Sequence, residues 1–398
     1  DTVPVSLGDM TLTFAGTVRV PGHLVYLHPI HDLAVIGYDP SLLGDLPVSA
    51  APVDTRTLRP GDRVWQVGLG GDRELVSRKT RVDAVQPVML GISTTPRFRD
   101  TNVDGVSIEE GVDSYGGLLA DGKGRLRALW ASFLDPASGE RTFWGLPAWI
   151  ADPIVDPLLH GRAPVYRTLG VELAPLSLAS ARDRGLSDDR IRQFLQADPR
   201  GRQVLEVQRV NGRAPAFGVL RDTDLLLAVD GELVTHPSDL ELRMQAPMLT
   251  LTILRKGVEQ DVEVETLPLD GTGVDRALSW AGLVLHEPHP DVAAQGGLDP
   301  QGVYVAWLWF GSPGARYGVR PTWRIVAVDG EPTPTLDAFL DVVTRLDEGA
   351  AVRLETERLD GSRGVTTLEL DLAYWPTQLL ELRPDGTWAR SAASGEER

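Results

Sequence analysis

The chain has 398 residues, of which 42% are hydrophobic and 24% charged; at ~150 residues per domain, this predicts two or three globular domains and excludes wholesale disorder. The formal net charge of −17 repels phosphate backbones and anionic lipid heads, so nucleic acid and membrane surfaces are not expected partners. The absence of cysteine excludes thiol nucleophiles, disulfides, thiolate zinc sites and iron–sulfur clusters.

Residues 1–160 are expected to form an all-β barrel or sandwich, because short apolar runs alternate there with Gly and Pro turns and few helical periods occur. The expected strands are Thr11–Phe14, Thr17–Val20, His23–Leu27, Ala34–Tyr38, Arg63–Gly68, Thr80–Val85 and Leu126–Ser132. Three prolines and a glycine mark residues 152–164 as a linker.

The second part of the chain contains an internal repeat. The five residues Ala228–Glu232 recur letter for letter as Ala327–Glu331. Each copy follows an apolar strand, turns at Asp-Gly and leads into an amphipathic helix, expected at 237–245 and at 335–346. Two β-runs follow each helix. The sequence therefore predicts two copies of a module of ~100 residues, which we call the first module (164–270) and the second module (276–374), followed by a tail (375–398).

Three segments resemble the HtrA-type serine proteases, which are trypsin-like double barrels followed by PDZ domains. His31–Ile36 resembles the segment that carries the triad aspartate, and Leu58–Val64 resembles the entry to the second barrel. Asp113–Asp121 lies where the family has its nucleophile loop. A closer similarity is to the degenerate second half of the tandem, pro-apoptotic members of that family. The residues that carry it are Val25–Pro29, Tyr38–Leu43, Thr95–Arg99, Arg127–Trp130, Trp280–Gly282, Pro288–Pro290, Gly302–Ala306 and Tyr374–Thr377.

The resemblance implies a mainly β fold: a partial trypsin-like double β-barrel followed by two PDZ domains, each a small β-barrel with helices. Residues 1–160 would be a degenerate protease domain that lacks its N-terminal part. The two modules would be the PDZ domains.

The resemblance also implies that the catalytic triad is incomplete. Asp32 matches the triad carboxylate, as a remnant. Counting back from Gly124 places Tyr115 in the nucleophile position, with Ser114 one residue early, and a phenol is a poor substitute for an activated serine. No Thr-x-x-His segment precedes Asp32, so the position of the histidine would fall before Asp1. Because a serine protease needs all three groups, hydrolysis by this chain alone is not expected.

In the two modules the resemblance implies peptide binding by strand addition, with a terminal carboxylate held by backbone N–H groups of a glycine-containing loop. In the first module this loop includes Leu169, Gly170 and Val171, and Arg167 adds a positive charge beside it. In the second module Ala281, Gly282 and Leu283 occupy the same place, without a neighbouring cation.

Two rival chemistries are disfavoured, so neither a metal nor a cofactor is expected. His28 and His31 flank Pro29, which prevents the helical spacing of a metal site. The Gly68–Gly71 segment lacks the third glycine and the following helix of a dinucleotide site.

Our main hypothesis is a pseudoprotease with two PDZ domains, which binds C-terminal or exposed hydrophobic peptide segments for substrate recruitment or regulation in protein quality control. One alternative is an active endopeptidase whose triad is completed by an upstream histidine and Ser114. Another alternative is a purely structural scaffold.

The chain begins with Asp rather than Met, without a signal-peptide pattern or an apolar run of the ~18 residues that span a membrane. We therefore expect a piece of a longer protein, with an active protease half upstream as a partner. The sequence is compatible with a homo-oligomer but does not predict one. It does not predict the compartment either, because fungal members of the family are nuclear but no basic localisation run occurs here.

Overall fold

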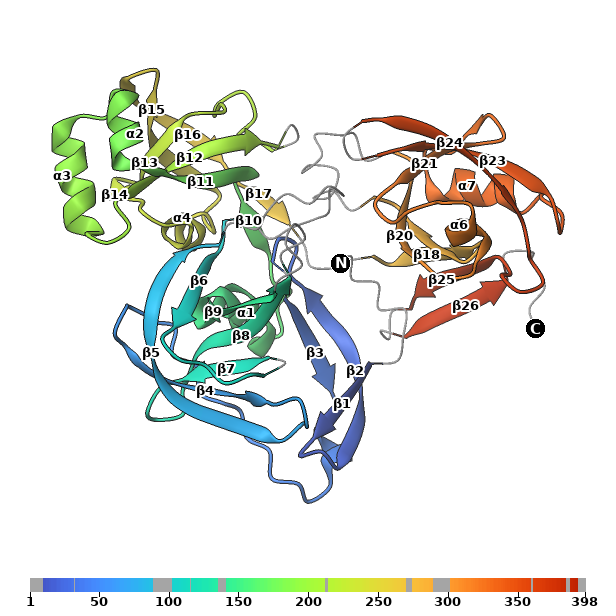
Figure 1. Ribbon diagram of the computed structural model, residues 1–398, viewed down its shortest axis with the longest axis horizontal. Coiled ribbons are helices and arrows are strands. Elements are labelled where there is room, and N and C mark those ends of the chain that lie inside the picture. The colour runs from blue at the N-terminus through green and yellow to red at the C-terminus, as the bar shows by residue number, and fades with distance from the viewer. Residues whose placement is uncertain are drawn as a thin grey trace. The chain divides into compact units, whose positions relative to one another are not determined.

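The computed structural model describes residues 10–31, 33–88, 102–114, 116–134, 141–211, 214–269, 274–288, 301–358, 361–383 and 387–392 (Figure 1). The described chain is mainly β and divides into two compact units. One unit contains the described residues of 47–270, and the other contains those of 10–46 and 274–392. Among these residues, no helix is both long enough and apolar enough to cross a membrane.

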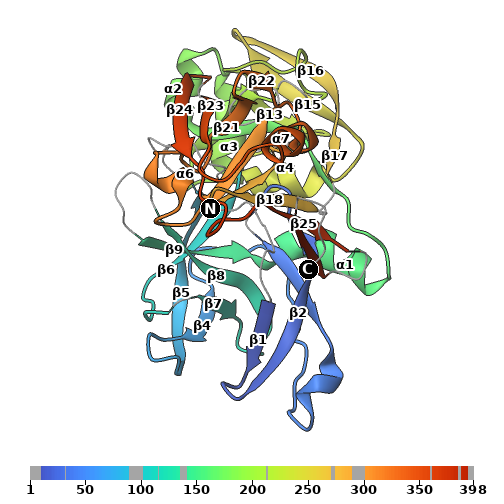
Figure 2. The same ribbon diagram turned by 90° about the vertical axis from the view of Figure 1, so that its right-hand side faces the viewer.

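A closed barrel forms the first part of the 47–270 unit, with strands in the order β4-β5-β6-β9-β8-β7 (Figures 1 and 2). Its strands are β4 (Arg63–Leu69), β5 (Leu75–Pro87), β6 (Asp104–Ile108), β7 (Gly117–Ala120), β8 (Leu126–Leu134) and β9 (Arg141–Pro147). Val64, Val106 and Leu119 are completely buried inside the barrel. Closure pairs every strand on both edges, which removes the edges that would otherwise aggregate.

A short helical segment follows the barrel where a linker was expected. It consists of η2 (Ala148–Ala151) and α1 (Asp152–Leu159). Pro153 lies in the first turn of α1, where its missing N–H leaves no helical hydrogen bond unmade. Pro153 therefore marks the start of a helix directly after the barrel, and Pro157 lies inside the same helix.

The first module follows in the same unit. Its small sheet pairs β10 (Tyr166–Thr168) with β17 (Leu267–Leu269). Its large sheet has the order β11-β12-β13-β15-β16, with β14 beside β13. These strands are β11 (Val171–Ser177), β12 (Gln203–Val210), β13 (Leu225–Val229), β14 (Glu232–Leu233), β15 (Met248–Arg255) and β16 (Val258–Glu265), and the helices are α2 (Leu178–Asp183), α3 (Asp188–Ala197) and α4 (Pro237–Arg243).

The second module lies in the other unit and forms, with two strands of the expected tail, one sheet with the order β24-β23-β21-β20-β19-β18-β25-β26, with β22 beside β21. The strands of the module are β18 (Arg276–Trp280), β19 (Leu283–His286), β20 (Val303–Leu308), β21 (Arg324–Val328), β22 (Glu331–Pro332), β23 (Ala351–Glu357) and β24 (Arg363–Glu369), and those of the tail are β25 (Gln378–Leu382) and β26 (Trp388–Ala392). Its helices are α6 (Pro313–Arg316) and α7 (Leu336–Val343). The expected tail thus contributes two strands to this sheet.

The core of the second module is built around an aromatic pair. Trp280 and Phe339 are fully buried and pack edge to face, with ring centroids 5.2 Å apart. This geometry places the positive edge of one ring on the negative face of the other.

The repeat predicted from the sequence is confirmed. In both copies the Asp-Gly pair adopts positive φ, at 49° and 81° for Asp230 and Gly231 and at 48° and 85° for Asp329 and Gly330. Such a pair closes a tight two-residue hairpin, which here joins β13 to β14 and β21 to β22. A helix and a β-hairpin then follow in each copy, as expected.

The N-terminal strands form a separate three-stranded antiparallel sheet with the order β1-β2-β3. The strands are β1 (Met10–Phe14), β2 (Val18–Leu27) and β3 (Ala34–Tyr38), followed by η1 (Pro40–Leu43). The two strands expected at 17–20 and 23–27 are one continuous strand, β2. Pro21 and Gly22 lie inside this strand and do not end it.

Candidate functional site

The residues expected at the protease-like site are described only in part. Asp32 and Tyr115 lie outside the described residues. Ser114 is buried, with 3% of its surface exposed, and its Oγ accepts a hydrogen bond of 3.2 Å from Gln66 Nε2. The Gln66 side chain also donates to the carbonyl of Val112 and accepts from the Val112 N–H, at 2.9 and 2.7 Å. Gln66 on β4 therefore fixes the segment that leads into β7.

The contact between Gln66 and Ser114 orients the serine hydroxyl without activating it. A side-chain amide N–H is a donor and cannot take a proton from a hydroxyl. A serine nucleophile needs a base such as an imidazole in that position. The hydrogen bond described for Ser114 is thus one that stabilises a loop.

The loop of the first module that contains Leu169, Gly170 and Val171 is a tight turn that only glycine fits. Gly170 has a φ of +65°, and a Cβ added to it would lie 2.5 Å from the Cβ of Ala214. The Gly170 N–H donates to Thr168 Oγ1 at 3.1 Å, and Leu169 is buried. The backbone at Gly170 therefore lies closer to Ala214 than a residue with a Cβ atom could lie.

Strand β11 begins directly after this loop and is the terminal strand of its sheet. Along its length it pairs with β12 in an antiparallel ladder, from Val171↔Val210 to Ser177↔Gln203. The N–H and C=O groups on the outer side of a terminal strand are the groups to which an extended peptide adds. The first module thus places a glycine turn and a sheet edge side by side.

The side chain of Arg167 makes contacts that the sequence did not predict. Its guanidinium donates to Thr266 Oγ1 at 2.8 Å and to the Thr266 carbonyl at 3.1 Å. Its backbone N–H donates to Gln245 Oε1 at 2.9 Å. Both acceptors of the guanidinium are neutral, so within the described part of the chain it is positioned by a hydroxyl and a carbonyl.

The corresponding loop of the second module is a different structure. Ala281 and Gly282, with φ of 49° and 70°, form the two-residue turn of the β18–β19 hairpin. Leu283 begins β19 and pairs with Trp280 on one side and with Leu308 on the other. The turn is enclosed, because a Cβ on Gly282 would lie 2.1 Å from the Cβ of Ser312.

The two modules therefore differ in the strand that precedes the loop. In the first module β10 pairs with β17, away from β11. In the second module β18 folds directly back on β19, whose other edge pairs with β20. Both edges of β19 are thus already hydrogen-bonded within the sheet.

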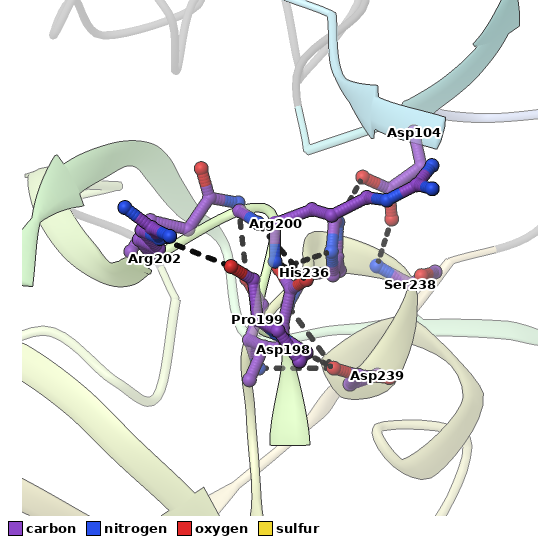
Figure 3. A network of polar contacts seen from close by, with 11 residues as sticks. Asp104, Asp198, Pro199, Arg200, Arg202, His236, Ser238 and Asp239 are labelled. Carbon is purple, nitrogen blue, oxygen red and sulfur yellow. Dashed lines mark hydrogen bonds and ion pairs between the residues drawn. The ribbon is translucent and has the colours of Figure 1, made fainter. Parts of the chain in front are cut away.

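A polar network that sequence reasoning missed lies at the start of α4 (Figure 3). His236 Nδ1 lies 3.1 Å from Asp104 Oδ1 of β6, and His236 Nε2 lies 3.2 Å from Asp198 Oδ2. The Ser238 N–H donates to the second oxygen of Asp104 at 2.9 Å, and the His236 N–H donates to Asp239 at 3.0 Å. The histidine therefore joins the barrel to the first module.

The charges of this network favour a protonated histidine. Burial opposes the charged imidazolium, but the hydrogen bond to Asp104 and the nearby carboxylates of Asp104, Asp198 and Asp239 outweigh it and raise the pKa of His236 to about 9. Both ring nitrogens then donate to carboxylates. The sequence carries no local signal for this pair, because Asp104 and His236 are 132 positions apart.

No family model matches the sequence. The chain is 36% identical to "Protease Do-like 7" of Arabidopsis thaliana, over 98% of this chain and 39% of the plant protein. It is 31% identical to the "Pro-apoptotic serine protease nma111" of Aspergillus niger and to a "PDZ domain-containing protein" of Schizosaccharomyces pombe, in both cases over 94% of this chain and 38% of the relative. The chain thus spans about two-fifths of the length of these curated relatives.

Among solved structures, the "HtrA-type protease AlgW with decapeptide" is 18% identical, with a TM-score of 0.43 over 66% of this chain and 76% of that chain. This likeness is too low to define the fold, which instead follows from the barrel and the sheets themselves.

A mainly β chain with a closed barrel and two copies of a strand-and-helix module is the layout that the sequence predicted. Along almost its whole length the chain is related to part of these plant and fungal proteins, which are named as Do-like and pro-apoptotic serine proteases. The family resemblance inferred from the sequence is therefore confirmed.

Proposed function

We propose that this chain is a peptide-binding part of an HtrA-type serine protease that does not itself cleave peptides, and that the first module binds the peptide. One observation carries the proposal: β11 is the terminal strand of its sheet and begins at the Gly170 turn. In this proposal residues 1–160 are a degenerate protease domain, and the modules at 164–270 and 276–374 are PDZ domains.

The peptide would add to β11 as a further strand. Its backbone would bond to the outer N–H and C=O groups of residues 171–177, and its terminal carboxylate would bind N–H groups of the Gly170 turn. Thr168 Oγ1 now accepts the Gly170 N–H, so it holds a place that a carboxylate oxygen would take. Val171 and Leu173 are apolar and buried, which favours hydrophobic peptide side chains beside them.

For the second module we propose a structural role. Both edges of β19 are paired, with β18 and with β20, so a peptide would have to displace a strand of the sheet. The turn that contains Ala281 and Gly282 is also enclosed by Ser312. The scaffold alternative is therefore favoured for this module, and peptide binding for the first.

For catalysis we propose that any cleavage comes from an upstream protease half and not from Ser114. The hydrogen bond from Gln66 supports this, because the amide cannot act as a base. The alternative, an endopeptidase that uses Ser114 and an upstream histidine, would need Gln66 to leave the hydroxyl.

The proposal is tested by the binding of fluorescent hydrophobic peptides to the 398-residue chain, comparing a free with an amidated C-terminus. We expect the free carboxylate to bind at least about tenfold more tightly, since a charge-assisted hydrogen bond is worth ~1.5–3 kcal/mol. Equal binding of the two peptides, or binding of neither, would contradict it.

A further inference from the structure

The last strand of the second module, β24, forms one end of its sheet. It pairs with β23 on one edge, from Ala351↔Glu369 to Glu357↔Arg363, and no described strand pairs with its other edge (Figure 1). It contains neither proline nor lysine, and its register with β23 has no bulge. Proline, lysine and bulges are features with which proteins commonly prevent a sheet edge from pairing with another chain. The outer edge of β24 is therefore able to accept a further strand.

The hydrogen bonds at the two ends of this hairpin show which residues of β24 face outward. The Leu370 N–H donates to the Ala350 carbonyl, and the Arg358 N–H donates to the Ser362 carbonyl, both at 2.9 Å. Antiparallel strands bond to each other at every second residue, so the even-numbered residues of β24 bond to β23. The backbone groups that point outward belong to the odd-numbered residues, whose side chains are all exposed: Arg363, Val365, Thr367 and Glu369.

These four outward residues are complementary to themselves in reverse order. When two copies of β24 lie antiparallel and centred on Thr366, Arg363 of each copy lies opposite Glu369 of the other, and Val365 lies opposite Thr367. Each such pair exchanges two backbone hydrogen bonds, so the ladder would contain about eight. Opposite charges and β-branched residues that face each other across strands stabilise the pairing. A shift of the register by two residues would pair fewer residues and separate the charges.

The equivalent strand of the first module has the opposite character. Strand β16 follows α4 and β15 as β24 follows α7 and β23, and it is also a terminal strand of its sheet. The Thr266 N–H donates to the Pro247 carbonyl at 3.0 Å, so the odd-numbered residues of β16 face outward by the same reasoning. All four are acidic and exposed: Glu259, Asp261, Glu263 and Glu265. Two copies of β16 would place carboxylates opposite each other in every register, so this edge repels itself.

We propose that β24 is a self-association site, at which two copies of this chain join the sheets of their second modules by antiparallel pairing of β24 with β24. The occupant is a second copy because the outward residues carry one positive charge at one end of the strand and one negative charge at the other. A partner segment with charges of a single sign would meet a like charge at one of these ends. The inference goes beyond the proposed function, because it concerns the second module and does not depend on peptide binding by the first.

The two-fold symmetry of such a dimer doubles the effect of each substitution. Arg363→Glu places a glutamate opposite Glu369 at both ends of the ladder, and Glu369→Arg places an arginine opposite Arg363 at both ends. Each variant should raise the dissociation constant of the dimer by about 10- to 100-fold. When the two variants are mixed, opposite charges meet again at both ends. The mixture should therefore form a heterodimer about as tightly as the unmodified chain forms its dimer.

The test is analytical ultracentrifugation of the 398-residue chain from about 1 µM to 1 mM, since pairing through one strand is expected to be weak. The matched control is Arg353→Glu, which reverses an exposed charge on β23, where Arg353 faces Thr367 within the hairpin. We expect dimers of the unmodified chain and of Arg353→Glu, monomers of each β24 variant alone, and dimers of their mixture. The Val365 and Thr367 amide protons should also exchange more slowly in the concentrated protein, because only the dimer covers them.

A chain that stays monomeric up to about 1 mM overturns the proposal. The same holds if an added peptide then protects residues 363–369, because the edge would belong to peptide. A dimer that survives both charge reversals uses another surface, and a mixture that stays monomeric excludes the antiparallel register; either result overturns the proposal.

A second variant is needed if Arg363→Glu disturbs the fold, because Arg363 Nε also lies 3.3 Å from Glu357 Oε2 within the hairpin. Val365→Pro removes an outward N–H and leaves the bonds to β23 in place, since proline is tolerated on the outer side of an edge strand. We expect Val365→Pro to keep the circular dichroism spectrum of the unmodified chain and to lose the dimer. A dimer that persists in Val365→Pro overturns the proposal.

Discussion

The carboxylate of Asp104 lies 3.1 Å from the imidazole of His236 and connects the first strand residue of β6 to the start of α4. Asp198 binds the other ring nitrogen at 3.2 Å. The imidazole thus lies between two carboxylates. This arrangement makes the junction between the barrel and the first module depend on one proton.

The stability of the protein should fall as the pH rises past neutrality. The pKa of His236 is raised from 6.5 to about 9, so its contribution is full below pH 6.5 and is lost as the pH approaches 9. The loss should be on the order of 3 kcal/mol. Urea unfolding between pH 6 and pH 10 measures it, and His236→Gln should flatten the profile. If His236→Gln keeps the slope of the unmodified protein, or if the exposed-residue control His160→Gln removes it, the assignment is wrong.

Replacing Gly170 by alanine should remove peptide binding by the first module. The new Cβ meets Ala214, and a left-handed φ costs a residue with a side chain ~1–2 kcal/mol. Gly231→Ala is the matched control, because Gly231 also has positive φ, at 81°, but has open space around it. We expect at least tenfold weaker peptide binding for Gly170→Ala and little change for Gly231→Ala, by fluorescence anisotropy. Equal effects of the two would mean that the turn has no part in binding.

The stability of the first module should depend strongly on a buried ion pair. The Asp224 side chain is 2% exposed and accepts two hydrogen bonds from the guanidinium of Arg255, one of 2.8 Å from Nε. Asp224→Ala leaves the charge of Arg255 without its carboxylate partner and should lower the free energy of unfolding by about 3 kcal/mol. Asp189→Ala breaks an exposed pair with Arg192 and should cost less than ~1 kcal/mol. Denaturant unfolding measures the loss of stability in both variants. Similar losses would mean that burial of the ion pair does not determine how much it stabilises the module.

Ser114 should be unreactive towards reagents that label serine nucleophiles. Its hydroxyl is buried and bonded to an amide. Ser114→Ala should cost about 1 kcal/mol of stability, whereas Gln66→Ala should cost more, because it also leaves the Val112 N–H and C=O without the side chain that binds both. Covalent labelling followed by mass spectrometry is the measurement. Labelling that disappears in Ser114→Ala would support the endopeptidase alternative.

Features set by local sequence were predicted well. The strands from Thr11 to Ser132 follow apolar runs between turn residues, and the modules follow the repeated Asp-Gly turn, whose positive φ values occur in both copies. The helix α3 is mainly charged, yet its Ile191 and Phe194 lie in the core of the first module. Two apolar residues three positions apart lie on the same face of a helix and are enough to pack a charged helix against the core.

Features set by distant pairing were missed. Nothing near Asn102 indicates that its side chain would bond to β11, and the second module shares the five-residue repeat of the first without repeating the pairing of β10. Whether a strand turns away from its neighbour or folds back on it depends on which partner is available elsewhere in the chain. A single sequence holds no direct record of that choice.

Peptide binding at the edge of β11 can be measured by hydrogen exchange of the 398-residue chain, with and without a hydrophobic peptide that has a free C-terminus. We predict slower exchange in residues 168–177 of the first module and no change in residues 281–286 of the second. Protection that appears only in 281–286, or in neither segment while the peptide is bound, would show that the peptide does not bind at β11.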